Sequence, residues 1–274
     1  MTTAILASIG LKAERIQHVT ADEAFALMQT SFDRFMKLIA SLDADEWTRP
    51  TACTAWNVHD MVAHQAGGYA SGTGYREMLR QYTSRPKPGQ LMEDAINELQ
   101  VGERTATSPA DLIAELERVG PIAVRKWAFQ FRLIKPIGFP HPIAGFKSLR
   151  YLMWIIHSRD TWMHRLDICR ATGRPFEQTR EHDGRVNELV VLDVAELLKK
   201  KLHGRAITLI LGGIAGGTWQ IGTGTPEASI EMDVLDFNIY ASGRYNHSEG
   251  LARAKFSGDS ALAALAFKNI NVLY

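Results

Sequence analysis

The stretch 151–173, YLMWIIHSRDTWMHRLDICRATG, constrains the fold more than any other part of this sequence. At 3.6 residues per helical turn, Asp160 and His164 stand one above the other, and His157 lies three residues before Asp160 on nearly the same face. Burying such a polar stripe is costly unless its groups bond to each other, to other polar groups or to a metal. The sequence therefore predicts a buried helix whose polar side chains have bonding partners elsewhere in the fold or bind a metal.

An earlier segment, WNVHDMVAH at residues 56–64, offers a partner for this helix. His64 stands among apolar neighbours and would meet Asp160 and His164 if the two helices pack antiparallel. Two imidazoles and one carboxylate leave one coordination position for water or substrate, as in catalytic zinc sites. The alternative is a structural one, because His and Asp four residues apart often simply hydrogen-bond across a helix.

Length and composition indicate a globular chain of two domains. The chain has 274 residues, which exceeds the usual size of one domain, and 46% of them are hydrophobic against 22% charged. Lys and Arg number 31 and Asp and Glu number 30, so no net field favours nucleic acid or an anionic membrane. We expect neither as a partner.

The two cysteines, Cys53 and Cys169, are too few for a disulfide framework and lack the Cys-x-x-Cys spacing of metal or redox motifs. They favour a reduced, cytoplasmic location, and we expect both to be inert rather than nucleophilic. The N-terminal residues show no basic region ahead of an apolar run, and no stretch reaches the roughly 20 apolar residues of a membrane span. The sequence predicts an unprocessed chain with no membrane segment.

The first half of the chain shows repeated helix-start signals. Thr20 and Asn57 each stand three residues before an acidic residue, which is the spacing of a capping box. Ser108 precedes Pro109, and proline is tolerated in the first helical turn. Apolar residues follow each start at helical spacing, and a weaker helix is predicted from about residue 89. These elements predict a helical bundle.

Two segments of this half look unusual. Glycines at 67, 68, 72 and 74 follow His64, and they predict close backbone approach, a kink or an interruption, so we expect an irregular helix. Residues 133–147 hold three prolines and two glycines together with apolar residues. This segment is predicted to be a long loop that covers a pocket mouth.

The sequence pattern of the second half differs from that of the first, because short strand-like runs replace most of the helical periodicity. A helix is predicted over 179–203, followed by short strand-like runs separated by glycines, namely ITLILGG, TWQIG, ASIEM and ARAKFSG, and a last helix capped by Asp259. We expect residues 206–257 to form one small sheet covered by helices. The predicted domains are 1–175 and 180–274, with the boundary near residues 174–182.

Together these residues resemble the mycothiol-dependent maleylpyruvate isomerase family. The resemblance rests on the segment 56–64, on Asp160 and His164 in a helix that runs into Asp167 and GRP at 173–175, and on SGR at 242–244 with SGD at 257–259. It implies an α+β protein. The N-terminal domain would be a DinB-like four-helix bundle that binds a metal, and the smaller C-terminal α/β domain would be sterol-carrier-like.

In that family a His, a Glu and a second His bind zinc, and the resemblance places these ligands at His64, Asp160 and His164. The chain departs from the family at one ligand, since Asp stands where the family has Glu. The side chain is one methylene shorter and must reach about 1.5 Å less far. His157 is an alternative ligand.

The resemblance further implies an isomerase or transferase that uses a low-molecular-weight thiol, mycothiol or a similar one, together with a small-molecule substrate. A divalent metal, zinc or another, would favour the thiolate, which is the nucleophile. Arg244 in the SGR turn is expected to face a shared cleft and pair with a substrate carboxylate, or else to form a salt bridge. Two other functions remain open: a metal-dependent hydrolase on the same bundle, and a non-enzymatic stress or ligand-binding protein.

Overall fold

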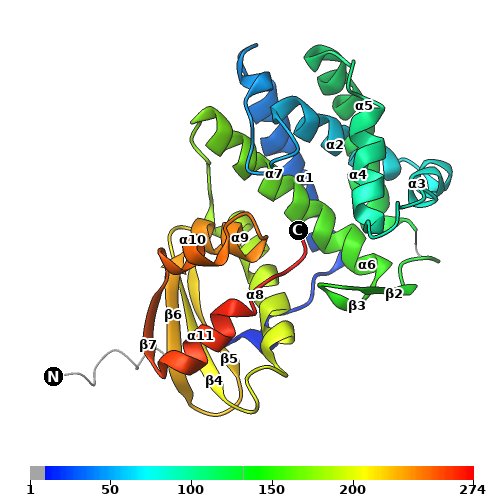
Figure 1. Ribbon diagram of the computed structural model, residues 1–274. Coiled ribbons are helices and arrows are strands. Elements are labelled where there is room, and N and C mark those ends of the chain that lie inside the picture. The colour runs from blue at the N-terminus through cyan, green and yellow to red at the C-terminus, as the bar shows by residue number, and fades with distance from the viewer. Residues whose placement is uncertain (1–9, 132) are drawn as a thin grey trace. The chain divides into compact units, whose positions relative to one another are not determined.

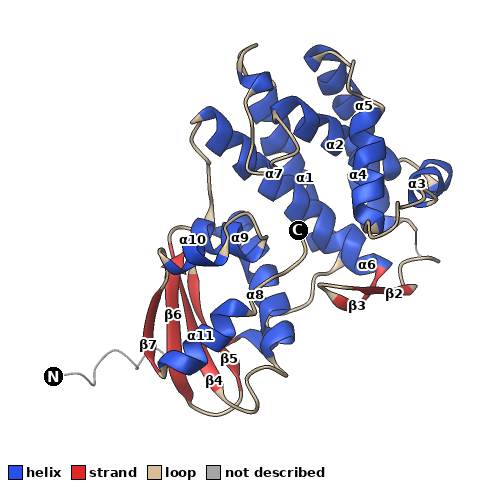
Figure 2. Ribbon diagram, viewed as in Figure 1, coloured by secondary structure: helices blue, strands red, loops and turns tan. Residues whose placement is uncertain are grey.

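The computed structural model describes residues 10–131 and 133–274, and the predicted absence of a leader falls mainly outside them. The chain divides into two compact units. The helical unit comprises Val19–Phe139 and Ser148–Phe176, and the sheet unit comprises the described residues up to His18, Pro140–Lys147 and Glu177–Tyr274. A mostly helical N-terminal region and a smaller sheet region confirm the predicted α+β class (Figures 1 and 2).

The helical unit is organised around four helices that pack on one another. Helix α1 contacts α5 and α7, and helix α2 contacts α5 and α7. Its elements are α1 (Ala21–Ile39), η2 (Glu46–Thr48), α2 (Val58–Ser71), α3 (Tyr75–Tyr82), α4 (Met92–Gly102), α5 (Pro109–Phe129), α6 (Leu149–Tyr151), η3 (Leu152–Ile156) and α7 (His157–Thr172). The predicted bundle is therefore present, and α2 and α7 are neighbours in it.

Side-chain caps start the bundle helices where the sequence predicts them. The Thr20 hydroxyl accepts the Glu23 N–H at 3.3 Å, and Ser108 caps α5 in the same way at 3.2 Å. Asn57 and Asp60 form a reciprocal capping box at the start of α2, with distances of 2.9 and 3.2 Å. Each bond satisfies a backbone N–H that has no partner within its own helix.

Helix α2 is regular, so the prediction of an irregular helix is wrong. It runs unbroken through Gly67 and Gly68 to Ser71. A Cβ built on Gly67 would lie 2.5 Å from the Gln100 side chain, and one on Gly72 would lie 2.6 Å from Trp127. These two glycines therefore allow α4 and α5 to approach α2 closely, which was one of the readings the glycines allowed.

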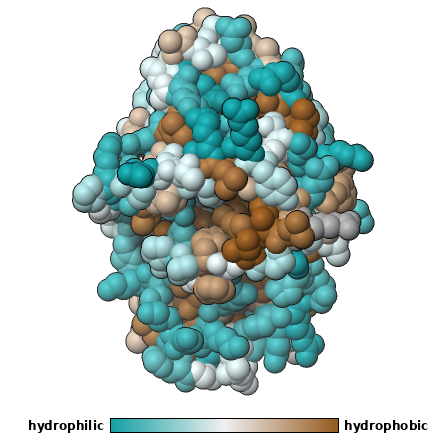
Figure 3. All heavy atoms as spheres, turned by 90° about the vertical axis from the view of Figure 1, so that its right-hand side faces the viewer, coloured by the Kyte–Doolittle hydropathy of each residue, from teal (hydrophilic) through white to brown (hydrophobic). Residues whose placement is uncertain are grey.

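The segment 133–147 is less irregular than its prolines and glycines predict. Strands β2 (Gly138–His141) and β3 (Gly145–Ser148) form a two-stranded sheet within it. Three large apolar side chains of this segment are exposed, namely Leu133 at 88%, Ile137 at 53% and Phe146 at 76%. Figure 3 views the side on which Figure 1 labels β2 and β3, and an apolar patch stands out there among hydrophilic side chains. That the segment 133–147 covers a pocket mouth stays a prediction.

Helix α7 is preceded by a π-helical turn, η3, and ends at Gly173, whose φ of 74° lies in the left-handed region. Glycine adopts this conformation without the clash that a Cβ would cause, which explains the stop that the sequence predicts there. The hydrophobic periodicity of the sequence did not predict the π-turn.

The sheet unit has a five-stranded sheet in the order β1-β5-β4-β6-β7. Strand β4 pairs antiparallel with β5 and parallel with β6, while β1 is parallel to β5 and β7 antiparallel to β6. Its elements are β1 (Leu11–Lys12), η1 (Ala13–Arg15), η4 (Arg180–Gly184), α8 (Arg185–Leu198), β4 (Ala206–Gly212), β5 (Gly217–Gly222), β6 (Pro226–Asp233), α9 (Val234–Ala241), α10 (His247–Leu251), β7 (Lys255–Gly258) and α11 (Ser260–Lys268).

Apolar side chains from this sheet and its helices form one core. Helices α8, α9 and α11 contact β5, β4 and β6 respectively, and Leu209, Ile230 and Phe267 are fully buried between them. The segment 10–18 also contributes to this core through Ala13 and Ile16, although the sequence prediction placed it with the bundle. Strand β1 in this segment pairs with β5, about 200 residues further along the chain, so no local pattern reveals this pairing.

Among the described residues, none of the helices combines the length and apolarity that crossing a bilayer requires.

Candidate metal centre

The structure brings His64, Asp160 and His164 together within the helical unit. His64 projects from α2, and the other two residues project from α7. One Asp160 carboxylate oxygen lies 3.4 Å from His64 Nε2, and the other lies 3.1 Å from His164 Nε2. Donor atoms of the three residues all lie within 4.8 Å of one another. We name these three residues the His–Asp–His cluster.

The cluster is buried but not sealed. The side chains of His64 and His164 are 10% and 5% exposed, whereas that of Asp160 is 23% exposed. The carboxylate is thus the member that solvent or a small molecule reaches most readily. A buried ligand set with one accessible side is the arrangement that an open metal site requires.

The three side chains of the cluster influence one another's pKa. Burial alone would raise the pKa of Asp160, but His164 and His64 outweigh it and hold that pKa well below its usual value. Burial would lower the pKa of His164, yet the Asp160 and Asp167 carboxylates raise it to about 9. Without a metal, the cluster is therefore an ion pair in which His164 holds a proton.

Asp167 is a buried partner of the cluster that the sequence analysis did not single out for this role. Its carboxylate lies 3.2 Å from His164 Nδ1, and its side chain has no exposed surface. A histidine that binds metal through one ring nitrogen usually bonds a carboxylate through the other, which fixes the ring. The spacing of three residues on one helix was the available signal.

A second group of polar side chains holds the Asp160 carboxylate. The Gln65 amide donates to Asp160 Oδ2 at 2.5 Å, and its Oε1 accepts the Thr161 hydroxyl at 2.8 Å. The Tyr69 hydroxyl lies 2.9 Å from Thr161 Oγ1. This chain of bonds orients the Asp160 carboxylate. Sequence reasoning missed it, because Gln65 has to be placed across two helices.

Aromatic rings form the walls of the cluster. The Trp56 ring lies 4.9 Å from the His64 ring and 5.9 Å from the His164 ring. His157 stacks on Trp127 at 3.7 Å with nearly parallel planes, and burial lowers its pKa to about 4. The described residues place His157 in no ligand triad, so it remains close to the cluster without joining it.

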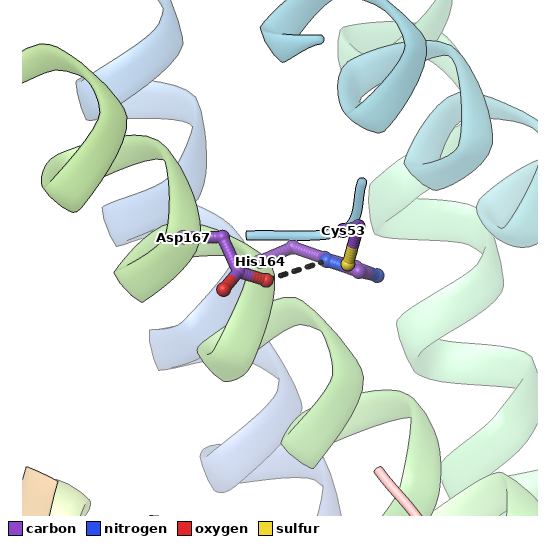
Figure 4. Close-up of side chains that lie close together, drawn as sticks. All are labelled: Cys53, His164 and Asp167. Atoms are coloured by element: carbon purple, nitrogen blue, oxygen red, sulfur yellow. Dashed lines mark hydrogen bonds and ion pairs between the residues drawn. The ribbon is translucent and has the colours of Figure 1, made fainter. Parts of the chain in front are cut away.

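Cys53 lies close to His164 and to Asp167 behind it. Its sulfur, a ring nitrogen of His164 and a carboxylate oxygen of Asp167 lie within 4.8 Å of one another. Figure 4 shows the thiol against the His164 ring, with Asp167 bonded to the same ring. The two triads thus share His164. Cys169, by contrast, is buried, and its thiol donates to the Pro175 carbonyl at 3.6 Å.

Arg244 lies in the sheet unit, in the turn that follows α9. Its N–H donates to the Ile239 carbonyl at 3.0 Å, and Gly243 before it has a φ of 76°. The turn therefore holds the arginine backbone in a defined position, with the residue half-buried. Its role toward a substrate carboxylate stays a prediction.

The donors present suit a divalent metal such as zinc. The Asp160 carboxylate places one oxygen 3.1 Å from His164 Nε2 and its other oxygen 3.4 Å from His64 Nε2, so it bridges the two imidazoles of the donor set. His64 Nδ1, the ring nitrogen that does not face Asp160, is buried without a hydrogen-bond partner, so His64 lacks the supporting bond that Asp167 gives to His164. Two imidazoles and a carboxylate are also a common zinc donor set.

Fold and cluster together define a class: an α+β protein whose helical bundle encloses a buried His–Asp–His cluster. The family model described as the mycothiol maleylpyruvate isomerase N-terminal domain matches residues 28–169. The chain therefore belongs to this family, as the sequence resemblance predicted.

Solved structures agree on the fold. A mycothiol-dependent maleylpyruvate isomerase is similar with a TM-score of 0.55 and 16% sequence identity, over 87% of this chain and 93% of that one. A mutant of that isomerase with a histidine replaced by alanine has the same TM-score and 15% identity, at the same coverage. A search of curated proteins gave no significant match.

Proposed function

We propose that this protein is a metal-dependent enzyme that uses a low-molecular-weight thiol, mycothiol or a similar one, as cosubstrate in an isomerase or transferase reaction. The observation that carries the proposal is the convergence of His64, Asp160 and His164 on a buried point with Asp160 accessible. Membership of the isomerase family supports the thiol and the reaction class.

Each residue has a defined task in this proposal. The His–Asp–His cluster holds the metal, and Asp167 fixes the His164 ring while Gln65 fixes the Asp160 carboxylate. A bound zinc ion supplies a positive charge that favours thiolate over thiol, because two neutral imidazoles and one carboxylate leave a net charge of +1.

The substrate would be a small molecule with an activated double bond and a carboxylate. The thiolate adds to one carbon of that bond, rotation follows about the resulting single bond, and elimination of the thiolate restores a trans double bond. Arg244 would pair with the substrate carboxylate or with the enolate that forms during addition. The thiol is regenerated, so an isomerisation consumes none of it.

The decisive experiment separates the thiol-dependent reaction from hydrolysis by a metal hydroxide. Purified protein is analysed for bound metal, and turnover of an activated cis-alkene carboxylate is measured with and without added thiol. We expect about one zinc per chain and no turnover unless thiol is present. Turnover without thiol would favour the hydrolase, and absence of metal would favour the non-enzymatic protein.

A cysteine control accompanies this assay. Cys169 is buried and belongs to neither group of metal-donor side chains among the described residues, so Cys169→Ser should retain metal and turnover. A folded, metal-loaded but inactive Cys169→Ser protein would show that a protein thiol is the nucleophile and would contradict the proposal.

A further inference from the structure

A cavity of about 330 Å³ lies within the sheet unit, and none of its lining residues belongs to the helical unit. Its walls come from three segments: 12–15, which holds the end of β1 and η1, 199–205, which joins α8 to β4, and 222–223 at the end of β5. Small-molecule sites in proteins have volumes of roughly 300–1,000 Å³. The cavity can therefore hold a small molecule, and the proposed reaction makes no use of it.

Hydrogen bonds join the three walls of this cavity. The Gly222 N–H donates to Glu14 Oε1 at 3.1 Å. The Thr223 N–H donates to the Arg205 carbonyl at 3.3 Å, and the Thr223 hydroxyl donates to the Gly204 carbonyl at 2.8 Å. Gly222 has a φ of 95°, and a Cβ built on it would lie 2.2 Å from the Arg205 carbonyl oxygen, so this close approach requires glycine. The walls are therefore held in a defined geometry.

Positive charge dominates the lining of the cavity. It contains four cationic residues, Lys12, Arg15, Lys199 and Arg205, against the single carboxylate of Glu14. Within the described part of the chain, the side chains of Lys12, Arg15 and Lys199 have no hydrogen-bond or ion-pair partner. Isolated lysines on a convex surface are common, but cations that surround one concave volume concentrate their field inside it and attract anions. We name this volume the basic cavity.

Arg205 contributes an oriented pair of donors to the basic cavity. Its Nε donates to the two Glu227 carboxylate oxygens at 3.1 and 3.0 Å, and its Nη2 donates to Glu227 at 2.6 Å and also to Asp259. These bonds fix the planar guanidinium, and its third nitrogen, Nη1, has no partner among the described residues. Counting both carboxylates that hold Arg205, four positive charges still meet only three negative ones.

We propose that the basic cavity binds the phosphate group of a small soluble molecule. A phosphate monoester carries a charge of about −1.5 to −2 at neutral pH and three acceptor oxygens, whereas a carboxylate carries one charge and two oxygens. Phosphate can therefore accept charge-assisted bonds from Arg205 Nη1 and from cations on the other walls at the same time. The inference goes beyond the proposed function, because the basic cavity uses no metal, thiol or alkene.

Calorimetric titration of the full-length protein with inorganic phosphate, at constant ionic strength, tests the proposal. We expect saturable binding in the wild type, and Lys199→Gln should weaken it about 5- to 10-fold through loss of one charge-assisted bond. Lys201→Gln is the matched control, because it removes the same charge from an exposed lysine that does not line the basic cavity, and its affinity should equal that of the wild type. Acetate, a monoanion, should bind at least about 10-fold more weakly than phosphate.

A second measurement needs no variant and locates the bound ion. Phosphate should shift the amide NMR signals of Gly204, Gly222 and Thr223, which line the basic cavity. Shifts confined to α2 and α7 would place phosphate at the candidate metal centre and overturn the proposal. It would also be overturned by absence of saturable binding, by equal weakening in Lys199→Gln and Lys201→Gln, or by equal affinity for acetate. Lys199→Gln should keep its metal content and thiol-dependent turnover, so either proposal can fail without the other.

Discussion

Helices α7 and α8 have similar lengths, 16 and 14 residues, but they are buried by opposite means. Helix α8 buries a nearly continuous apolar face, made of Val186, Leu189, Val190, Val191, Leu192, Val194, Ala195 and Leu198. Helix α7 buries charged and polar side chains as well, including Arg159, His164, Arg165 and Asp167. Apolar burial stabilises a fold directly, at about 25 cal/mol per Å², whereas buried charge is costly unless it is paired.

The contrast between the two buried faces indicates which helix carries the candidate metal site. Helix α8 serves the core of the sheet unit mainly through its apolar face, and its buried Asn187 accepts a hydrogen bond from the Asn238 amide at 3.1 Å. Helix α7 needs specific partners for its polar side chains, and Asp160 and His164 find them in Gln65, Asp167 and each other. The two helices should therefore respond differently to substitution, one in metal binding and the other in stability.

The largest effect is expected from removing a ligand on α7. His164→Ala deletes an imidazole that faces Asp160, so zinc affinity should fall by more than about 100-fold, beyond the loss seen for residues that only support a ligand. Competition with a chromophoric chelator measures the affinity, and activity should disappear with the metal. Retained zinc in this variant would remove the distinction between α7 and α8.

The converse substitution lies on α8. Leu198 is fully buried in the core of the sheet unit, so Leu198→Ala should lower the free energy of unfolding by about 3 kcal/mol through lost burial and a cavity. Urea denaturation measures this change. Zinc affinity of the folded variant should equal that of the wild type, and a parallel loss of affinity would show that the two helices are not functionally separate.

A smaller effect is expected from the carboxylate behind His164. Asp167→Asn keeps the shape of the side chain but weakens its bond to Nδ1, so zinc affinity should drop about 10- to 100-fold. Asp183→Asn is the matched control, because Asp183 is an equally buried carboxylate in the sheet unit, bonded to the Thr179 N–H at 2.6 Å. The control should lose stability without losing zinc, and equal zinc loss in both variants would rule out an orienting role.

The last prediction concerns the pH dependence of the stability of the metal-free protein, which the charged groups on α7 should determine. In metal-free protein the raised pKa of His164, about 9, contributes stability that is complete below pH 6.5 and is lost as pH rises through 9. The lowered pKa of Asp160 contributes stability that is lost only in acid, below the ordinary carboxyl range. Urea denaturation with a chelator should show stability declining between pH 6.5 and 9, at no more than about 1.4 kcal/mol per pH unit for one proton.

Zinc should abolish that alkaline decline, since a histidine that binds metal is already neutral. The variant Leu198→Ala should keep the decline at lower overall stability, because its substitution leaves the cluster unchanged. A decline of equal slope with zinc bound would mean that His164 is not a ligand.

Local chemistry made much of the fold predictable. The caps at Thr20, Asn57 and Ser108 act within three residues, so sequence alone locates those helix starts. The stripe of Asp160 and His164 follows from helical geometry in the same way. By contrast, the pairing of Leu11 with Trp219 joins segments about 200 residues apart, and only tertiary structure decides it.

The site shows the same limit. His64 was assigned to the cluster by a pattern on two helices, but the partner Gln65 was not, since its role depends on the distance and rotation between elements. The glycines of α2 mark the opposite error: their high intrinsic cost in a helix led us to expect an irregular helix, whereas Gly67 and Gly72 lie in close packing against α4 and α5 and the helix is regular.

The π-turns η3 and η4, which precede α7 and α8, have a consequence for how such chains diverge. A π-turn holds one residue more than the α-helical turn that it replaces, so it is a place where a helix can accommodate a single-residue insertion. Each residue advances a helix by about 100°, and a deletion within 152–156 that restores α-helical geometry would therefore rotate only the side chains upstream of the turn. Relatives of this chain can gain or lose a residue there while the spacing from Asp160 to His164 survives unchanged.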